Sequence, residues 1–340
     1  MAAERAFQEP AIAVDDLSVR FVRREGTAAA VNGVSFALTP GEVLTILGES
    51  GSGKSVTLKA LMGLLPGYAQ VGGKIRVAGR DLLSLPPAEL AKLRGGAVSM
   101  IFQEPITALD PVYTIGHQIA ETIVQHEGIA RAAAMRRALE ALERVKIPSA
   151  ARRLKNYPHE LSGGMRQRAM IALALACKPA VLLADEPTTA LDVTVQIQIL
   201  LLLRQLQQEL GMAVLFVTHD VGVAAEISDR IAVMYAGRLV ETGTVREVLR
   251  ARRHPYTRGL LASTVHGGMR GRDLDMIPGN PPSLAELPPG CAFAPRCRDA
   301  IEPCHRAAPP VVQINPGAMV RCVHAVPAVE YAPAGQSVPA

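Results

Sequence analysis

The sequence predicts an α/β fold, and the alternation of two kinds of segment supports this. Short apolar runs that are typical of strands occupy residues 43–47, 98–102, 181–184 and 213–217. The last two are continuously apolar, as expected when a parallel sheet is covered on both faces. Helical patterns follow at residues 166–176, 193–210 and 221–228. Strands that alternate with helices in this way predict a sheet flanked by helices.

Length and composition exclude some classes of protein. The 340 residues are 49% hydrophobic, enough for one large domain or two, and the net charge is only +5. This mild charge does not form a focused basic patch, so we expect no nucleic-acid partner. The apolar runs are far shorter than the roughly 20 residues that span a bilayer. The charged N-terminus also lacks a secretory signal pattern, so we expect a cytoplasmic protein.

Two further structural units are predicted around this core. Alternating patterns at residues 13–21 and 31–38 predict antiparallel strands joined by a polar turn, and residues 72–80 predict another strand and turn. Residues 113–155 are rich in Ala, Glu, Arg and Leu with few helix breakers, which is typical of an inserted helical lobe. We place the helical subdomain at about residues 104–178.

The composition changes after about residue 255. Nine prolines between residues 278 and 310 make this part a poor former of helices or sheets. We therefore predict a domain over residues 1–255 and a separate, loop-rich appendage over residues 256–340. The Ala- and Pro-rich end from about Val326 is expected to be mobile.

A phosphate-binding loop lies between the first apolar run and the helical pattern after it. Residues 48–55 fit the pattern G-x-x-x-x-G-K-[ST], in which glycines let backbone N–H groups cradle phosphates. Lys54 would neutralise the phosphates, and the Ser55 hydroxyl would be a Mg²⁺ ligand. A glycine-rich turn between two core elements is the alternative. The predicted nucleotide contacts are Gly48, Ser50, Gly51, Gly53, Lys54, Ser55 and Val56.

Two acidic residues follow the apolar run at residues 181–184. A carboxylate at the carboxyl edge of a sheet is well placed to hold Mg²⁺ through water, and a second one can act on an attacking water. We assign Asp185 to the metal and Glu186 to general base. Two solvated acids at a strand end would be the ordinary alternative.

The segment Leu161-Ser162-Gly163-Gly164-Met165-Arg166-Gln167-Arg168 resembles the signature sequence of the ABC transporter ATPase family. Met165 stands where the family usually has Gln, whereas the Ser and both Gly are retained. In the family the signature binds the γ-phosphate of ATP held by another subunit. The resemblance therefore implies that Ser162, Gly163 and Gly164 act in trans.

Other family elements occur in the family's order and imply further roles. Gln103 matches the Q-loop and would contact Mg²⁺ or the γ-phosphate, and Asp192 belongs to the D-loop. His219 matches the switch histidine, which would hold the γ-phosphate while Glu186 takes a proton from water. Phe21 stands where the family stacks an aromatic ring on adenine. Taken singly, each would be an ordinary strand-end or core residue.

Segments at residues 254–261, 278–282 and 291–297 are similar to the C-terminal region of dipeptide/oligopeptide permease ATPases, a branch that includes nickel importers. The resemblance implies a peripheral subunit on the cytoplasmic face of the membrane. Its implied partners are a second, different ATPase chain, two transmembrane permease subunits and an extracytoplasmic substrate-binding protein. We also expect the helical lobe and the Gln103 loop to receive helices of the permease.

Four cysteines gather in the appendage, namely Cys291, Cys297, Cys304 and Cys322. Their wide spacing is unlike the C-x₂₋₄-C pairs of structural zinc sites and suits a [4Fe-4S] cluster. A zinc site and unliganded thiols remain alternatives, and His305 or His324 could complete a mixed zinc site.

The resemblance implies an ATP-hydrolysing subunit that powers the import of dipeptides or oligopeptides, and several other functions compete with this interpretation. A non-transport ABC ATPase acting on DNA or ribosomes would typically have coiled coils or two ATPase domains, and the sequence shows neither. A catalytically dead binding module would not require Lys54, Asp185, Glu186 and His219 together. An exporter subunit is a further alternative, against which the appendage argues. The transported solute, whether dipeptide, longer peptide or nickel complex, stays open.

Overall fold

The computed structural model describes residues 9–24, 26–189, 191–263 and 276–325. The segment from Val326, which was expected to be mobile, lies outside these residues. Within them, no helix is both long enough and apolar enough to cross a membrane.

An eight-stranded sheet with the order β11-β12-β10-β9-β3-β8-β7-β6 forms the centre of the molecule. Its strands are β3 (Val43–Leu47), β6 (Val98–Ile101), β7 (Val181–Asp185), β8 (Ala213–Thr218), β9 (Arg230–Tyr235), β10 (Arg238–Thr244), β11 (Val312–Asn315) and β12 (Ala318–Val320). The pairs β3–β8, β3–β9, β7–β8 and β6–β7 are parallel. Every residue of β3, β6, β7 and β8 is buried, which confirms the predicted parallel sheet covered on both faces.

Each face of this sheet packs into a different apolar cluster. Leu182 and Ala184 of β7 join one cluster, and Val181 and Leu183 join the other, as the two-residue period of a strand requires. The helices adjoining these strands are α1 (Lys54–Leu61), α8 (Val193–Leu210), α9 (Val221–Ile227) and α10 (Val245–Ala251). Helix α8 has the bounds that its pattern predicted.

A second, antiparallel sheet packs against the cluster that contains Val181 and Leu183. It has the order β2-β1-β4-β5, with β1 (Ile12–Arg23), β2 (Gly26–Leu38), β4 (Ala69–Val77) and β5 (Arg80–Asp81); helix α2 (Pro87–Leu93) follows. The first two strands extend to the hairpin pair Arg23 and Gly26, so they are longer than predicted. Their outer ends are exposed and lack the apolar alternation that marks the inner parts.

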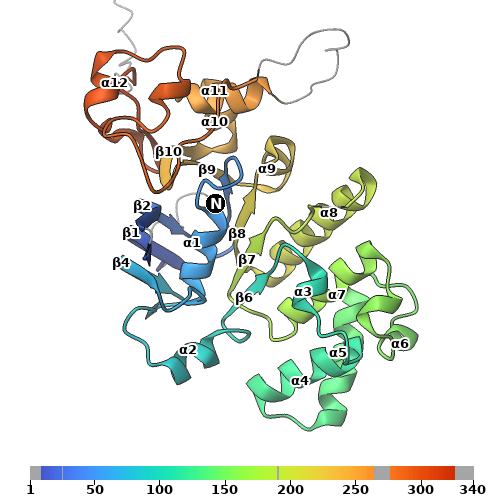
Figure 1. The fold of residues 1–340 in the computed structure, drawn as a ribbon. Helices are drawn as coiled ribbons and strands as arrows, with labels where there is room; N and C mark the ends of the chain where they lie inside the picture. Colours follow the sequence, from blue (N-terminus) through green and yellow to red (C-terminus); the bar gives the residue numbers. More distant parts are fainter. Residues whose placement is uncertain (1–8, 25, 190, 264–275, 326–340) are drawn as a thin grey trace, which may run out of the picture.

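The helical lobe lies to one side of the sheet, as the green segments of Figure 1 show. It contains α3 (Pro105–Ala108), α4 (Ile115–Glu127), α5 (Arg131–Arg144), α6 (Ala150–Arg153), a 3₁₀ turn (Pro158–Glu160) and α7 (Gly163–Leu175). Its apolar side chains belong to the same cluster as Leu182 and Ala184. The lobe is therefore packed continuously onto the sheet.

The C-terminal region differs from the expectation of a separate appendage. It contains α11 (Pro255–Ala262), a 3₁₀ turn (Ala294–Arg296) and α12 (Glu302–Arg306) besides β11 and β12. Strand β12 pairs with β10 through Glu241 and Val320, so a C-terminal hairpin extends the central sheet. Prolines dominate the connecting loops, whereas Val312–Asn315 and Ala318–Val320 contain none. The domain boundary at residues 255 and 256 stays a prediction.

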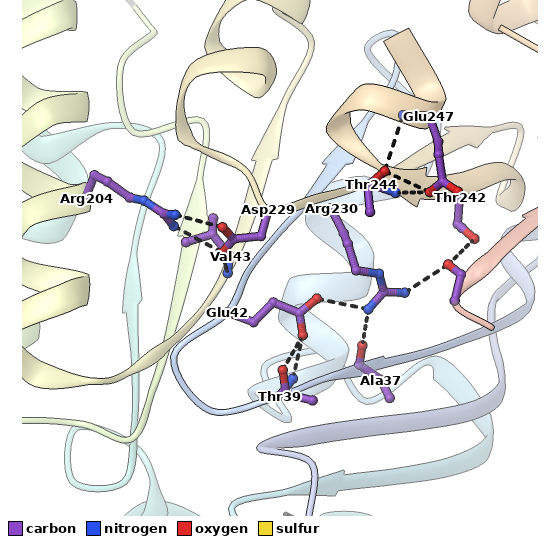
Figure 2. Close-up of polar contacts among 11 residues, drawn as sticks. Ala37, Thr39, Glu42, Val43, Arg204, Asp229, Arg230, Thr242, Thr244 and Glu247 are labelled. Carbon is purple, nitrogen blue, oxygen red and sulfur yellow. Dashed lines mark hydrogen bonds and ion pairs between the residues drawn. The ribbon is translucent and has the colours of Figure 1, made fainter. Parts of the chain in front are cut away.

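Charged side chains join these parts at the amino end of β3, as Figure 2 shows. The buried Glu42 carboxylate accepts a hydrogen bond from Thr39 N–H at 2.8 Å and pairs with Arg230 at 3.0 Å. Arg230 also donates to the carbonyl oxygens of Ala37 and Gly317. The network thus connects β2, β3, β9 and the C-terminal hairpin.

Candidate nucleotide site

The phosphate loop leaves the carboxyl end of β3 and enters α1, as predicted. A Cβ on Gly48 would lie 2.2 Å from the Met234 carbonyl oxygen, so no other residue fits there. Gly53 has a φ of +106°, and a Cβ would lie 2.4 Å from the Ala30 carbonyl oxygen. Both positions therefore require glycine for the close approach of neighbouring backbone.

Lys54 lies buried beneath this loop. Its Nζ donates to the carbonyl oxygens of Gly48 at 2.8 Å and Glu49 at 2.9 Å, and lies 3.9 Å from Glu186 Oε1. Burial lowers the pKa of Lys54, and the charges of Glu186, Asp185 and Glu49 oppose that shift. A buried ammonium among carbonyl groups is placed to bind an anion in the loop.

Ser55 and Asp185 are in direct contact. The Ser55 hydroxyl donates to Asp185 Oδ1 at 2.8 Å, and Asp185 is 4% exposed. Burial raises the pKa of Asp185, while the Ser55 hydrogen bond lowers it. A hydroxyl and a buried carboxylate are oxygen ligands of the kind that Mg²⁺ prefers, so these residues fit the predicted metal.

Glu186 is held at the end of β7 in an unusual conformation. Its φ of +44° is rare for a non-glycine residue. Glu186 Oε2 accepts a hydrogen bond from the Thr189 hydroxyl at 3.0 Å and lies 3.0 Å from His219 Nδ1. Sequence analysis missed Thr189, which no pattern had singled out.

Most of these residues line one cleft of about 740 Å³, whereas Gly48 and Asp185 are not part of its wall. Ten predicted site residues contribute to its wall: Phe21, Ser50, Gly51, Gly53, Lys54, Ser55, Val56, Gln103, Glu186 and His219. The Phe21 ring lies beside Tyr68, with a centroid distance of 5.9 Å. The remaining wall was not predicted and comprises Ala28, Ala30, Glu49, Thr189, Leu260, Ser263 and Leu284. Three of these residues come from the C-terminal region.

The signature residues lie apart from this cleft. Ser162 caps α7 by accepting a hydrogen bond from Met165 N–H, and Asp192 caps α8 by accepting one from Val195 N–H. A Cβ on Gly164 would lie 2.9 Å from Val195 Cγ1, so the starts of α7 and α8 approach closely. Ser162, Gly163, Gly164 and Asp192 are absent from the cleft wall. One chain therefore presents two separate sets of predicted nucleotide contacts.

All the described cysteines are free thiols. Cys304 and Cys322 are buried, and Cys291 N–H donates to the Cys304 carbonyl oxygen at 2.7 Å. Burial raises the pKa of Cys291, and the charges of Cys304 and Cys322 raise it further. Within the described ranges, however, no group of three or more His, Cys, Asp or Glu side chains is arranged to hold a metal ion. The four cysteines thus lie in one region of the chain, but their side chains are not arranged as the ligands of one metal ion.

Two family models match the chain. The model described as ABC transporter covers residues 31–189, which contain the phosphate loop, the signature and Glu186. The model described as oligopeptide/dipeptide transporter, C-terminal region, covers residues 240–304. The second match begins inside β10 and includes the first three of the clustered cysteines.

Known proteins resemble nearly the whole chain. The oligopeptide transport ATP-binding protein OppD of Salmonella typhimurium is 49% identical over 91% of this chain and 92% of its own. The dipeptide transport ATP-binding protein DppD of Bacillus subtilis is 47% identical over 88% and 90%. Among solved structures, the ATP-binding cassette MJ0796, a dimer in a post-hydrolysis state bound to ADP and Pi, has a TM-score of 0.63 and 29% identity. That match covers 69% of this chain and 99% of the other. The chain therefore belongs to the ABC transporter ATPases, in the branch with the oligopeptide/dipeptide transporter C-terminal region.

Proposed function

We propose that this chain is the ATP-hydrolysing subunit of an importer for dipeptides or oligopeptides. The observation that carries the proposal is a cleft lined by the phosphate loop, Glu186 and His219 in the same chain as the oligopeptide/dipeptide C-terminal region. The relatives named for oligopeptide and dipeptide transport match both parts. A nickel complex or another small solute is the alternative cargo.

The experiment is uptake by the assembled transporter. Proteoliposomes would contain this chain, two permease subunits, the partner ATPase and the binding protein, and would be offered labelled dipeptides, oligopeptides or nickel. We expect ATP-dependent peptide uptake that stops when this chain is omitted. Nickel uptake without peptide uptake would overturn the proposed substrate class.

The cleft residues divide the chemistry among them. Lys54 and the loop N–H groups bind the triphosphate. Ser55, Asp185 and Gln103 would hold Mg²⁺, which would neutralise phosphate charge when bound. Glu186 accepts the proton of the attacking water, and its contacts with Thr189 and His219 fix the direction of its carboxylate. His219 then orients the γ-phosphate.

The signature acts on a second ATPase subunit. Ser162, Gly163 and Gly164 are outside the cleft, and the start of α7 presents backbone N–H groups and the positive end of a helix. These groups would complete the cleft of the partner, with Asp192 close to the junction. By resemblance to its branch, the partner is a different chain and the pair sits beneath two permease subunits on the cytoplasmic face of the membrane.

The helical lobe is the proposed contact with the permease. Val112 and Tyr113 are exposed apolar side chains on the segment between Gln103 and α4. A permease helix bound there would affect the cleft through Gln103, which lies on the same segment and lines the cleft. Substitutions at Val112 and Tyr113 are expected to uncouple transport from ATP hydrolysis; unchanged transport and assembly would contradict this contact.

The four clustered cysteines are proposed as ligands of a [4Fe-4S] cluster, with Zn²⁺ as the alternative. Their position in one region of the chain, in which the Cys291 N–H donates to the Cys304 carbonyl oxygen, supports the proposal. Metal binding would require the thiols to lose their protons, which the raised pKa values of Cys291 and Cys322 oppose. Anaerobic purification followed by iron, sulfide and zinc analysis tests it. About four iron and four sulfide per chain would support the cluster, whereas one zinc without colour would support the alternative.

A further inference from the structure

The C-terminal region holds the phosphate loop through Glu49. Arg296 Nη1 lies 2.7 Å from Glu49 Oε2, and Nη2 lies 3.1 Å from Oε1, which makes a two-pronged ion pair. Arg296 is 7% exposed, whereas the Glu49 side chain is 28% exposed and lines the cleft. The cation is thus buried behind a carboxylate that faces the nucleotide site.

Arg296 makes further contacts with Pro278 and Tyr235. Its Nε donates to the Pro278 carbonyl oxygen at 2.9 Å, and Nη1 donates to Tyr235 Oη at 3.3 Å. The guanidinium carbon lies 5.8 Å from the centre of the Tyr235 ring. A planar guanidinium held by so many contacts loses little freedom when it pairs with a carboxylate.

A second contact ties the backbone of the same residue. Glu49 N–H donates to Tyr256 Oη at 2.9 Å. Tyr256 is fully buried and packs against Tyr235 and Phe293, with ring centroids 4.5 Å and 5.4 Å away. Helix α11 therefore holds the backbone of Glu49 through Tyr256, and the segment around Arg296 holds its side chain.

We propose that Arg296 is a positioning residue for ATP binding, which acts by neutralising Glu49. A bare carboxylate in the phosphate loop would repel the triphosphate, because like charges in a cleft repel strongly at low effective dielectric. Pairing with Arg296 removes this repulsion and fixes the loop. The inference rests on the proposed function as an ATPase, and it gives the C-terminal region a direct part in nucleotide affinity.

Binding of ATP with Mg²⁺ to the full chain tests the proposal in R296M, E49Q and the E49Q/R296M double variant. R296M exposes the Glu49 charge and is expected to weaken ATP binding about three- to tenfold. The double variant removes that charge as well, so most of the affinity is expected to return. In steady-state hydrolysis R296M should raise KM and leave kcat nearly unchanged, and added salt should reduce the difference.

The matched control is R204M, which removes another two-pronged arginine pair, with Asp229 at 2.7 and 3.1 Å (Figure 2). It should leave ATP affinity unchanged, because that pair lies at the opposite end of β3 from the loop. R296K retains the positive charge but cannot form the two-pronged pair, so its ATP affinity is expected to lie between those of the wild type and R296M. If R296M is too unstable to purify, R296K and the double variant are compared with the wild type.

The outcomes are distinct. Equal ATP affinity in R296M and the wild type would overturn the proposal. So would a double variant that binds as weakly as R296M, because Arg296 would then serve only the packing of the C-terminal region. R296K that binds as weakly as R296M would have the same meaning. A wild-type chain that does not bind ATP would instead refute the proposed function.

Discussion

The two ends of strand β3 carry charged residues in opposite arrangements. At the amino end, Glu42, Arg230, Asp229 and Arg204 pair with one another and with backbone groups (Figure 2). At the carboxyl end, Lys54 is surrounded by backbone carbonyl groups and acidic side chains, and an open cleft lies above it. One set of charges is complete within the chain, whereas the other is arranged to receive a ligand.

The two ends of β3 therefore have different roles: the amino end stabilises the fold, and the carboxyl end forms part of the binding site. Charges that are satisfied internally stabilise the join between β3 and β9. Residues around the cleft carry costs that their neighbours offset only in part, namely the positive φ of Glu186 and the burial of Asp185 and Lys54. Substitutions at the amino end should therefore change stability, and those at the carboxyl end should change binding or turnover.

The largest expected effect is at Glu186. E186Q keeps the shape of the side chain but removes the general base, so ATP turnover should fall by about 10² to 10⁴. ATP binding and thermal stability should remain close to the wild type. Steady-state phosphate release and a direct binding measurement check this. Turnover near the wild-type rate would show that Glu186 is not the base.

R230M tests the other end of the strand. It leaves the buried Glu42 carboxylate without its cation, and loss of one partner of a buried pair costs several kcal/mol. Arg230 is partly exposed, so we expect a loss of about 3 kcal/mol in the free energy of unfolding. Urea unfolding measures it. An R230M chain that is as stable as the wild type but binds ATP poorly would contradict the claim that the amino end of β3 serves stability and not binding.

His254 predicts a stability effect that depends on pH. It is 1% exposed, its ring accepts a hydrogen bond from Tyr256 N–H, and burial together with Arg258 lowers its pKa from 6.5 to about 3. The unfolded chain therefore takes up a proton below about pH 6.5 that the folded chain refuses until about pH 3. Stability due to neutral His254 is present above pH 6.5 and is lost as the pH falls.

The loss for this single group should reach about 2 kcal/mol at pH 5. Unfolding by urea at pH 7 and pH 5 measures it, and H254N provides the comparison because it cannot take up this proton. The H254N chain is expected to lose about 2 kcal/mol less than the wild type over this interval. Equal pH dependence in both chains would contradict the assignment.

The central sheet and the cleft were predictable because their signals are local. The apolar runs that became β3, β7 and β8 have the length and the apolar content of buried strands, and the phosphate loop is one continuous segment. Ten residues assigned to nucleotide or catalysis meet in one cleft. Gln103, Ser162 and His219 were assigned roles only because they match elements of the family in the family's order. No local pattern identifies these three residues as functional.

The contacts between distant segments were not predictable from such signals. Arg296 and Tyr256 lie in segments that were singled out for the branch, yet nothing in their spacing placed them against Glu49. The C-terminal hairpin was not predicted, because the many prolines around it indicated a region that forms neither helices nor sheets. Strand pairing across 75 or more residues, as between β10 and β12, depends on the assembled sheet.

The smallest expected effect is at Arg204. Its pair with Asp229 is partly exposed on both sides, and such pairs contribute about 0.5 to 1 kcal/mol. Asp229 also accepts a hydrogen bond from Val43 N–H at 2.8 Å, and R204M leaves that contact in place. Urea unfolding should therefore show a loss below that of R230M by about 2 kcal/mol. A loss equal to that of R230M would mean that Arg204 is required to hold Asp229 against β3, and that the network at this end acts as one unit.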